Sequence, residues 1–198
     1  MASQAELIKK LREETGAGIL DAKKTLESMG GDYDKALSIL KAKGIERAEK
    51  KAAERTAKDG TIKTYVHNGK VGVMVELNCE TDFVARTPQF QDVAHAVALQ
   101  IAAMNPKYVS VEEIPADVLE TQKKTFTDAT LAEGKPANIV EKIVAGKLDK
   151  YFGEAVLLKQ PYIKDDKQTI EELVKGASAQ TGEKIIVRRF TRYVLGED

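Results

Sequence analysis

Two runs of alternating residues, separated by Asn68-Gly69, constrain the fold of this chain more than any other part of its sequence. Alternation of apolar residues with a period of two is typical of a half-buried β-strand, and it extends over 61–67 and 71–79. Both central positions of a tight hairpin turn need positive φ, which asparagine and glycine accept. A two-residue loop opposes positions 67 and 70, so we expect Val66 to face Val71 and Ile62 to face Val75 on one buried face.

Helical periodicity precedes this hairpin. Three short amphipathic patterns lie within residues 7–44, interrupted at Thr15-Gly16 and at Gly30-Gly31. Asp32 is suited to cap the third helix, which we expect to end near Gly44. The first part of the chain is therefore predicted to be a compact three-helix domain.

Helices and one further strand follow the hairpin. Helical spacing covers 90–104, and proline is suited to begin the helices after Pro115 and Pro136. Thr169 and Glu172 form a capping box for a last helix, and 184–195 reads as a third strand with apolar residues at both parities. This order predicts an α+β fold, in which a core with a three-stranded antiparallel sheet packs against helices.

The two predicted regions are joined by a charged segment. Residues 41–58 contain seven basic and three acidic residues, for a net charge of +4, and almost no large apolar side chain. We interpret the segment as an exposed helical linker, which divides the chain into 1–45, 46–59 and 60–198. The alternative is a nucleic-acid-binding protein that uses 41–58, although no aromatic residue is present there to stack on a base.

Composition excludes several classes of protein. Lys and Arg number 31, as do Asp and Glu, and a net charge of zero argues against broad nucleic-acid binding. The single cysteine excludes an internal disulfide framework and a multi-thiolate metal site. No stretch approaches the roughly 20 apolar residues of a membrane span. We expect a cytoplasmic protein with no membrane partner.

Few side chains are arranged for catalysis. Cys79 would need a base and an electropositive, accessible setting to act as a nucleophile, yet alternation places it on the buried face. His67 beside the turn and His95 off the apolar stripe of its helix are expected at the surface. We find no recognisable acid/base pair, so the sequence gives little support to an enzyme and predicts no metal site.

The segment Asn78–Arg86 allows two interpretations. It leaves the predicted hairpin and enters the helix that carries Phe90. Thr81 or Asp82 can cap a helical turn here while Phe83 packs on the core. Alternatively, a rigid tip offers an aromatic ring and a carboxylate to a partner, which is the chemistry of a binding hot spot.

A family resemblance covers nearly the whole chain. Glu76-Leu77-Asn78-Cys79-Glu80-Thr81-Asp82-Phe83-Val84-Ala85-Arg86 resembles the signature of bacterial translation elongation factor Ts. A second signature of that family is similar to 11–26, with Thr25 where a small apolar residue is usual. The similarity continues through Gly134-Lys135-Pro136 and Gln160-Pro161.

The resemblance implies a guanine-nucleotide exchange factor for the GTPase elongation factor Tu, with no cofactor and no catalysis of its own. It implies that the N-terminal helices form a domain similar to ubiquitin-associated domains. It also implies that Thr81, Asp82, Phe83 and Val84 enter the GTPase near its magnesium site. Phe83 would wedge between switch-region helices, Asp82 would hold displaced elements by hydrogen bonding, and Thr81 and Val84 would brace the tip.

Further contacts are implied only by the resemblance. Lys23 and Lys24 are candidate contacts to the GTPase, and Gln100 stands near a position where longer members commonly have a histidine that meets the GTPase. Those members also carry a duplicated half-core and an extra helical hairpin, and neither is expected at 198 residues. Short members work as two-fold dimers, so we expect a non-covalent homodimer through the core sheet.

Overall fold

The computed structural model describes residues 3–52 and 55–197, and its contacts divide the chain into two compact units. Unit 1 comprises Met1–Thr64, Val75–Ala96 and Glu172–Arg189, and unit 2 comprises Tyr65–Met74, Val97–Glu171 and Phe190–Asp198. The division falls within three strands and two helices, so each unit contains pieces of the sheet. Residues 53–54 of the predicted linker lie outside the described residues.

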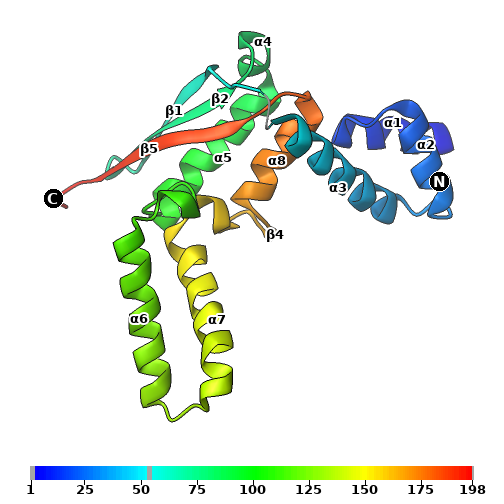
Figure 1. Cartoon of the computed structure of the whole chain (residues 1–198). Helices are drawn as coiled ribbons and strands as arrows, with labels where there is room; N and C mark the ends of the chain where they lie inside the picture. The colour runs from blue at the N-terminus through cyan, green and yellow to red at the C-terminus, as the bar shows by residue number, and fades with distance from the viewer. Residues whose placement is uncertain (1–2, 53–54, 198) are drawn as a thin grey trace. The chain divides into compact units, whose positions relative to one another are not determined.

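Unit 1 begins with three helices, α1 (Gln4–Thr15), α2 (Ile19–Ser28) and α3 (Tyr33–Ala52) (Figure 1). A capping box begins α1: Ser3 Oγ accepts from the Glu6 amide at 3.3 Å, and Glu6 Oε2 accepts from the Ser3 amide at 2.7 Å. Gly16 ends the helix with a φ of 66°, and Asp32 Oδ1 accepts from the Lys35 amide at 3.1 Å as the predicted cap of α3. The three helices share a core of Leu11, Ala22, Leu26, Ala36 and Leu40.

Helix α3 runs beyond the end that the sequence predicts for it. It continues through Gly44 to Ala52, because residues 45–52 are mostly good helix formers and include no proline. An interior glycine costs a helix only about 1 kcal/mol. A Cβ at Gly44 would lie 3.1 Å from the Cβ of Ala179 in α8 (Ile170–Thr181), so this glycine permits close packing between the two helices.

The three-stranded sheet has the order β1-β2-β5, from β1 (Asp59–His67), β2 (Val71–Cys79) and β5 (Ile186–Val194). The predicted hairpin turn is confirmed, because Asn68 and Gly69 have φ angles of 50° and 67°. The Lys70 amide closes the turn by donating to the His67 carbonyl at 2.9 Å. The predicted α+β fold class is confirmed with it.

The predicted faces of β1 are wrong. Ile62 and Val66 are exposed, by 61% and 65%, although the turn geometry placed them on the buried face. Lys63 Nζ instead donates to Gln91 Oε1 of α5 (Pro88–Met104) at 3.3 Å. The buried residues of β2 include those predicted: Val73, Val75, Leu77 and Cys79. Odd-numbered positions of both strands are thus the more covered ones.

The remaining helices are those that the sequence predicts. Figure 1 shows α5 running along one face of the sheet, and its fully buried residues are Phe90, Ala94, Val97, Ala98, Gln100 and Ile101. Pro115 and Pro136 are the N-cap residues of α6 (Ala116–Ala132) and α7 (Ala137–Ala155). These two helices of unit 2 pack together as a helical hairpin, so the expectation that the chain contains no such hairpin is wrong.

Unit 2 also contains short elements that the sequence analysis does not predict. They are the 3-10 turns Val111–Glu113 and Leu157–Lys159 and the two-stranded pair β3 (Pro161–Tyr162) and β4 (Asp165–Thr169). Strand β4 consists of polar residues only, so no apolar alternation marks it. Among the described helices, none is both long and apolar enough to cross a membrane.

Candidate functional site

The segment that follows β2 forms an exposed tip, Thr81–Val84, in unit 1. Its single helical turn, α4 (Asp82–Ala85), begins at Thr81, whose backbone is extended. Thr81 Oγ1 accepts a hydrogen bond from the Val84 amide at 3.4 Å and so caps the turn. The sequence-based prediction of a capped turn after β2 is confirmed.

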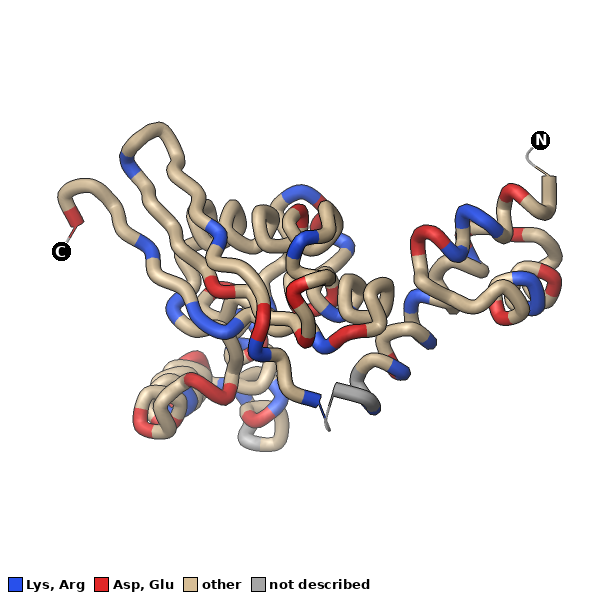
Figure 2. The backbone as a smooth tube through the Cα atoms, turned by 90° about the horizontal axis from the view of Figure 1, so that it is seen from above, with Lys and Arg blue, Asp and Glu red and all other residues tan. Residues whose placement is uncertain are grey.

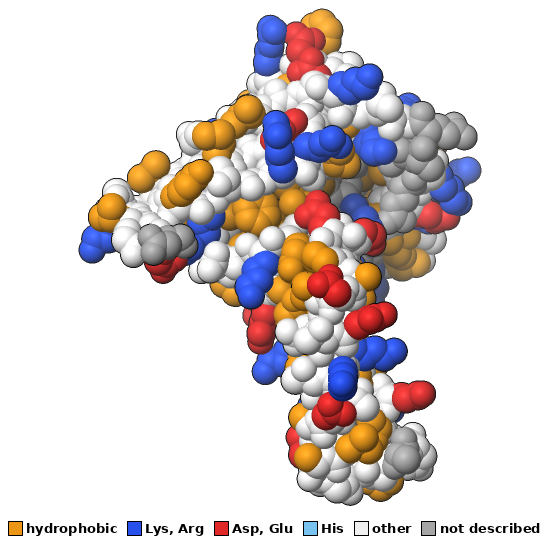
Figure 3. Space-filling model, turned by 60° about the vertical axis from the view of Figure 1, so that its left-hand side comes forward, with side chains coloured by type: hydrophobic (Ala, Val, Ile, Leu, Met, Phe, Trp, Pro, Cys, Tyr) orange, Lys and Arg blue, Asp and Glu red, His pale blue; other side chains and the backbone are white. Residues whose placement is uncertain are grey.

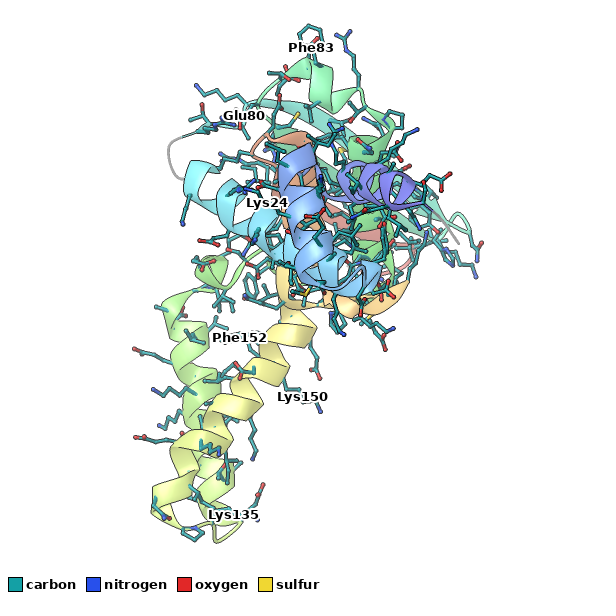
Figure 4. The ribbon with its side chains drawn as sticks, turned by 90° about the vertical axis from the view of Figure 1, so that its right-hand side faces the viewer. Lys24, Glu80, Phe83, Lys135, Lys150 and Phe152 are labelled. Atoms are coloured by element: carbon teal, nitrogen blue, oxygen red, sulfur yellow. The ribbon has the colours of Figure 1, made fainter. Side chains whose placement is uncertain are left out.

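Phe83 does not pack on the core. Its side chain is 81% exposed, and Figure 4 shows it directed away from the ribbon at the end of α4. Burying an aromatic side chain contributes about 1.5–3 kcal/mol. Since Phe83 stays in water in the free protein, this free energy is not gained on folding. It is available to any contact that buries the ring.

Polar contacts fix the two sides of the tip. Asp82 Oδ2 lies 2.8 Å from a guanidinium nitrogen of Arg86, one turn later, and both groups remain accessible. The Val84 carbonyl accepts from Thr87 Oγ1 at 2.8 Å, and the same hydroxyl accepts from the Phe90 amide at 3.3 Å. The carboxyl end of the tip is therefore linked through Thr87 to the first turn of α5.

The amino end of the tip is held by Glu183, which lies between α8 and β5. Glu183 Oε2 accepts from the amides of Glu80 and Thr81, each at 3.1 Å. Glu183 Oε1 accepts from Thr81 Oγ1 at 2.6 Å. One carboxylate thus forms three hydrogen bonds with Thr81, which begins the tip, and with Glu80, which precedes it.

Cys79 lies beneath the tip and is fully buried, as predicted. Its Sγ donates to the Thr81 carbonyl at 3.1 Å. Burial, with the negative charges of Glu183 and Asp59, raises the pKa of the thiol to about 11. The thiolate needed for nucleophilic catalysis is therefore disfavoured at neutral pH.

Comparison with known proteins assigns the family. The family model described as Elongation factor TS matches residues 6–197. The chain belongs to the elongation factor Ts family. Elongation factor Ts of Coprothermobacter proteolyticus is 52% identical over 198 residues, which cover all of both chains. Elongation factor Ts of Thermotoga petrophila and of Thermotoga maritima are each 54% identical over 198 residues, which cover this whole chain and 98% of theirs.

This match confirms the family resemblance noted in residues 11–26 and 76–86. Members of the elongation factor Ts family are translation elongation factors. The tip lies inside the second of the two signature segments.

The two lysines that the elongation factor Ts resemblance points to lie on α2. Lys23 and Lys24 are both exposed, and Figure 4 shows Lys24 on its helix. Lys23 Nζ is 3.9 Å from Glu27 Oε1, a loose surface pair. The contact of either lysine with a partner stays a prediction.

Gln100, in contrast, is fully buried in unit 2. Its Nε2 donates to Gln160 Oε1 at 3.1 Å and to the Pro161 carbonyl at 3.0 Å. Its Oε1 accepts from the Ile163 amide at 3.0 Å. This network ties α5 to the β3–β4 pair, so Gln100 has a structural role and offers no exposed atom to a partner.

The charged segment 41–58 pairs several of its cations with acids. Arg47 lies 2.8 Å from Asp21, and Lys50 lies 2.7 Å from Glu46 of the same helix. Arg55 is bound within the base of the tip, as described below. Figure 2 shows basic and acidic residues interspersed along the chain, which does not favour a phosphate-binding patch.

Within residues 3–52 and 55–197, no three His, Cys, Asp or Glu side chains are placed to hold a metal ion. His67 and His95 are both exposed, as the sequence predicts.

Sequence reasoning missed Glu183. It lies 102 positions from Thr81, and it belongs to neither signature segment. Its position between a helix-ending Gly182 and strand β5 carries no local pattern, so only the folded chain reveals its contact with the tip.

Proposed function

We propose that this chain is a guanine-nucleotide exchange factor that binds elongation factor Tu carrying GDP and speeds the release of GDP. The observation that supports the proposal is the exposed Phe83 on a tip bonded at both ends. In this mechanism Phe83 inserts between switch-region helices of the GTPase. Asp82 exchanges its contact with Arg86 for hydrogen bonds to the displaced elements.

The free energies involved are within reach of such a tip. A nucleotide held at nanomolar affinity is bound by about 12 kcal/mol, much of it through its phosphates and Mg²⁺. A ten-thousandfold acceleration of release lowers the barrier by roughly 5.5 kcal/mol. Insertion of one aromatic side chain, together with displacement of the groups that position Mg²⁺, supplies a contribution of this size, provided the tip itself does not yield.

The exchange factor needs no chemistry of its own. No bond is made or broken, so the chain acts as a binding protein and not as an enzyme, and it needs no cofactor. Because coupling between two ligands is reciprocal, tight nucleotide binding to the GTPase must equally weaken its affinity for the exchange factor. The α2 lysines, Lys23 and Lys24, give the GTPase a second contact from the same unit.

We also propose that two copies associate through an apolar part of the sheet in unit 2. We give the name sheet face to the exposed apolar residues there, Val66, Met74, Tyr193 and Leu195, of which Tyr193 and Leu195 are 74% and 76% exposed. An open groove is lined by Val66, Tyr193 and Leu195 together with Gly69, Gly72 and Gly196. Figure 3 shows hydrophobic side chains gathered over this part of the sheet. A contiguous apolar surface of this kind suits an isologous contact between two copies.

The decisive experiment measures release of a fluorescent GDP analogue from elongation factor Tu. We expect the wild-type chain to accelerate release by orders of magnitude and the Phe83→Ala variant to lose most of that effect while it stays folded. If the wild-type chain does not change the release rate, the proposed exchange activity is wrong. If both proteins act equally well, exchange does not depend on Phe83 and the wedge mechanism fails.

A further inference from the structure

Two carboxylates hold the base of the tip in place. Each accepts hydrogen bonds from the segment of the chain that carries the other. Glu183 accepts three hydrogen bonds from Glu80 and Thr81. In return, Glu80 Oε1 accepts from the Lys184 amide at 2.6 Å. We call this reciprocal arrangement of residues 80–81 and 183–184 the clasp. It joins two segments of unit 1 that lie about a hundred positions apart in the chain.

Arg55 reinforces the clasp from a third segment. Its Nη1 lies 3.0 Å from Glu80 Oε1 and 2.9 Å from the Gly182 carbonyl. Lys184 Nζ donates to the Arg55 carbonyl at 3.0 Å. The Arg55 guanidinium therefore neutralises the charge of Glu80 and donates a hydrogen bond to the backbone next to Glu183. Figure 4 shows Glu80 at the base of the segment that carries Phe83.

The tip needs this external support because it is too short to hold its own shape. Helix α4 contains four residues, and an isolated helical turn is unstable since nucleation fixes several dihedral angles for one hydrogen bond. Thr81 is the residue on which the turn and the clasp meet: its hydroxyl donates to Glu183 and accepts from the Val84 amide. The carboxylate thus fixes the rotamer of Thr81 in which its oxygen caps the turn.

We propose that Glu183 is a positioning residue for nucleotide exchange: it holds the start of the tip so that Phe83 transmits force to the GTPase instead of folding back. The inference rests on the proposed exchange function. Glu183 acts through Thr81 and the backbone of Glu80. Its loss therefore lowers the rate at which bound GTPase releases GDP more than it lowers the affinity for the GTPase.

The test compares three variants with the wild-type chain. Glu183→Ala removes all three bonds to residues 80–81. Glu183→Gln keeps an oxygen for the two amides, and its amide group can donate to the Thr81 hydroxyl, so it restores most of the geometry. Glu120→Ala removes an exposed carboxylate on α6 and controls for the change in net charge.

Release of the GDP analogue is measured at increasing concentration of each variant, which separates the maximal rate from the half-saturating concentration. We expect Glu183→Ala to lower the maximal rate at least about tenfold, as loss of several charge-assisted hydrogen bonds predicts, with a change of less than about threefold in half-saturation. Glu183→Gln recovers most of the rate, and Glu120→Ala matches wild type.

Hydrogen exchange of the free protein provides a second readout, independent of the GTPase. The amides of Glu80 and Thr81 are predicted to exchange faster in Glu183→Ala, while those of buried residues in α5 keep their wild-type protection. A merely structural Glu183 would instead lower protection across unit 1 and leave the maximal release rate unchanged per folded molecule.

If Glu183→Ala does not fold, Glu80→Ala and Glu80→Gln make the same comparison on the other carboxylate of the clasp: alanine removes the acceptor of the Lys184 amide and of Arg55, whereas glutamine retains an oxygen. We expect Glu80→Ala to lower the maximal rate more than Glu80→Gln does. If the wild-type chain is active and the disruptive and the conservative variant of each pair have equal maximal rates, the positioning role of Glu183 is overturned. The proposed exchange function would then still stand. If the wild-type chain does not speed GDP release from elongation factor Tu, the proposed function is overturned, and the inference with it. Hydrogen exchange would still show whether Glu183 protects the amides of the clasp.

Discussion

The tip and the sheet face both expose apolar side chains, but they differ in how those side chains are arranged. The tip presents one aromatic ring, Phe83, beside the charged Asp82 and Arg86, and its base is a set of charge-assisted hydrogen bonds. The sheet face presents several apolar side chains beside an open groove. Figure 3 shows this contrast, with charged side chains close around α4 and hydrophobic ones gathered on the sheet.

The difference indicates two kinds of partner. A single protruding anchor with a polar surround suits insertion into a crevice of another protein, where one residue carries most of the binding energy. An apolar surface made of several side chains has no such anchor and gains from burying area against a matching surface. We therefore expect damage to one surface to leave the function of the other intact.

The largest effect is expected at the tip. Phe83→Ala should lower the maximal rate of GDP release about a hundredfold, the size of a binding hot spot, and leave self-association unchanged. Stopped-flow release of the GDP analogue measures the first quantity and analytical ultracentrifugation the second. Leu131→Ala, at an exposed apolar position on α6, is the matched control. A parallel loss of exchange and self-association in Phe83→Ala would show that the two surfaces are not separate.

The next effect is expected on the sheet face. Tyr193→Lys places a charge in the proposed contact between copies and should weaken self-association at least about tenfold, because an unpaired charge is costly to bury. Sedimentation equilibrium over a range of concentrations gives the dissociation constant. Asn138→Lys introduces the same charge at an exposed position on α7 and should associate like wild type. A wild-type chain that is monomeric at micromolar concentration would contradict the proposed dimer.

A smaller effect, on stability and not on binding, is expected for the buried polar network around Gln100. Gln100→Leu removes the donor to the buried Gln160 Oε1 and the acceptor of the Ile163 amide, so the free energy of unfolding should fall by about 2 kcal/mol. Denaturant unfolding measures this loss, and Gln89→Leu at an exposed position of α5 is the control. GDP release per folded molecule should not change, and a selective loss of exchange would return Gln100 to the list of partner contacts.

The smallest effect is the pH dependence contributed by Cys79. Burial raises its pKa to about 11 from 9.0 in an unfolded chain, so the folded state holds the thiol proton more tightly. This contribution to stability is complete below pH 9 and is lost as the pH rises to 11; at pH 10 the loss is about 1 kcal/mol.

Thermal unfolding of wild type and Cys79→Ala between pH 8 and pH 11 measures this difference. The wild-type protein should lose more stability over that range than the variant, which lacks the thiol. Parallel pH profiles would show that the thiol titrates alike in both states.

Much of the fold could be predicted from local patterns. Pro115 and Pro136 mark the starts of α6 and α7, and Asn68-Gly69 marks the turn, because each fixes backbone geometry within a few residues. The covered face of β1 could not be predicted in this way. The turn has the expected φ angles, yet Ile62 and Val66 are exposed, since the choice between the two faces of a strand depends on which helices cover them.

The candidate site divides in the same manner. The family, a capped turn at Thr81 or Asp82 and the burial of Cys79 could be predicted from the sequence, because all three depend on contiguous residues or on strict alternation. The exposure of Phe83, the burial of Gln100 and the contact of Glu183 with the tip emerged only from the folded chain. These outcomes depend on residues 60 or more positions apart, and contacts over such separations leave no periodic trace in the sequence.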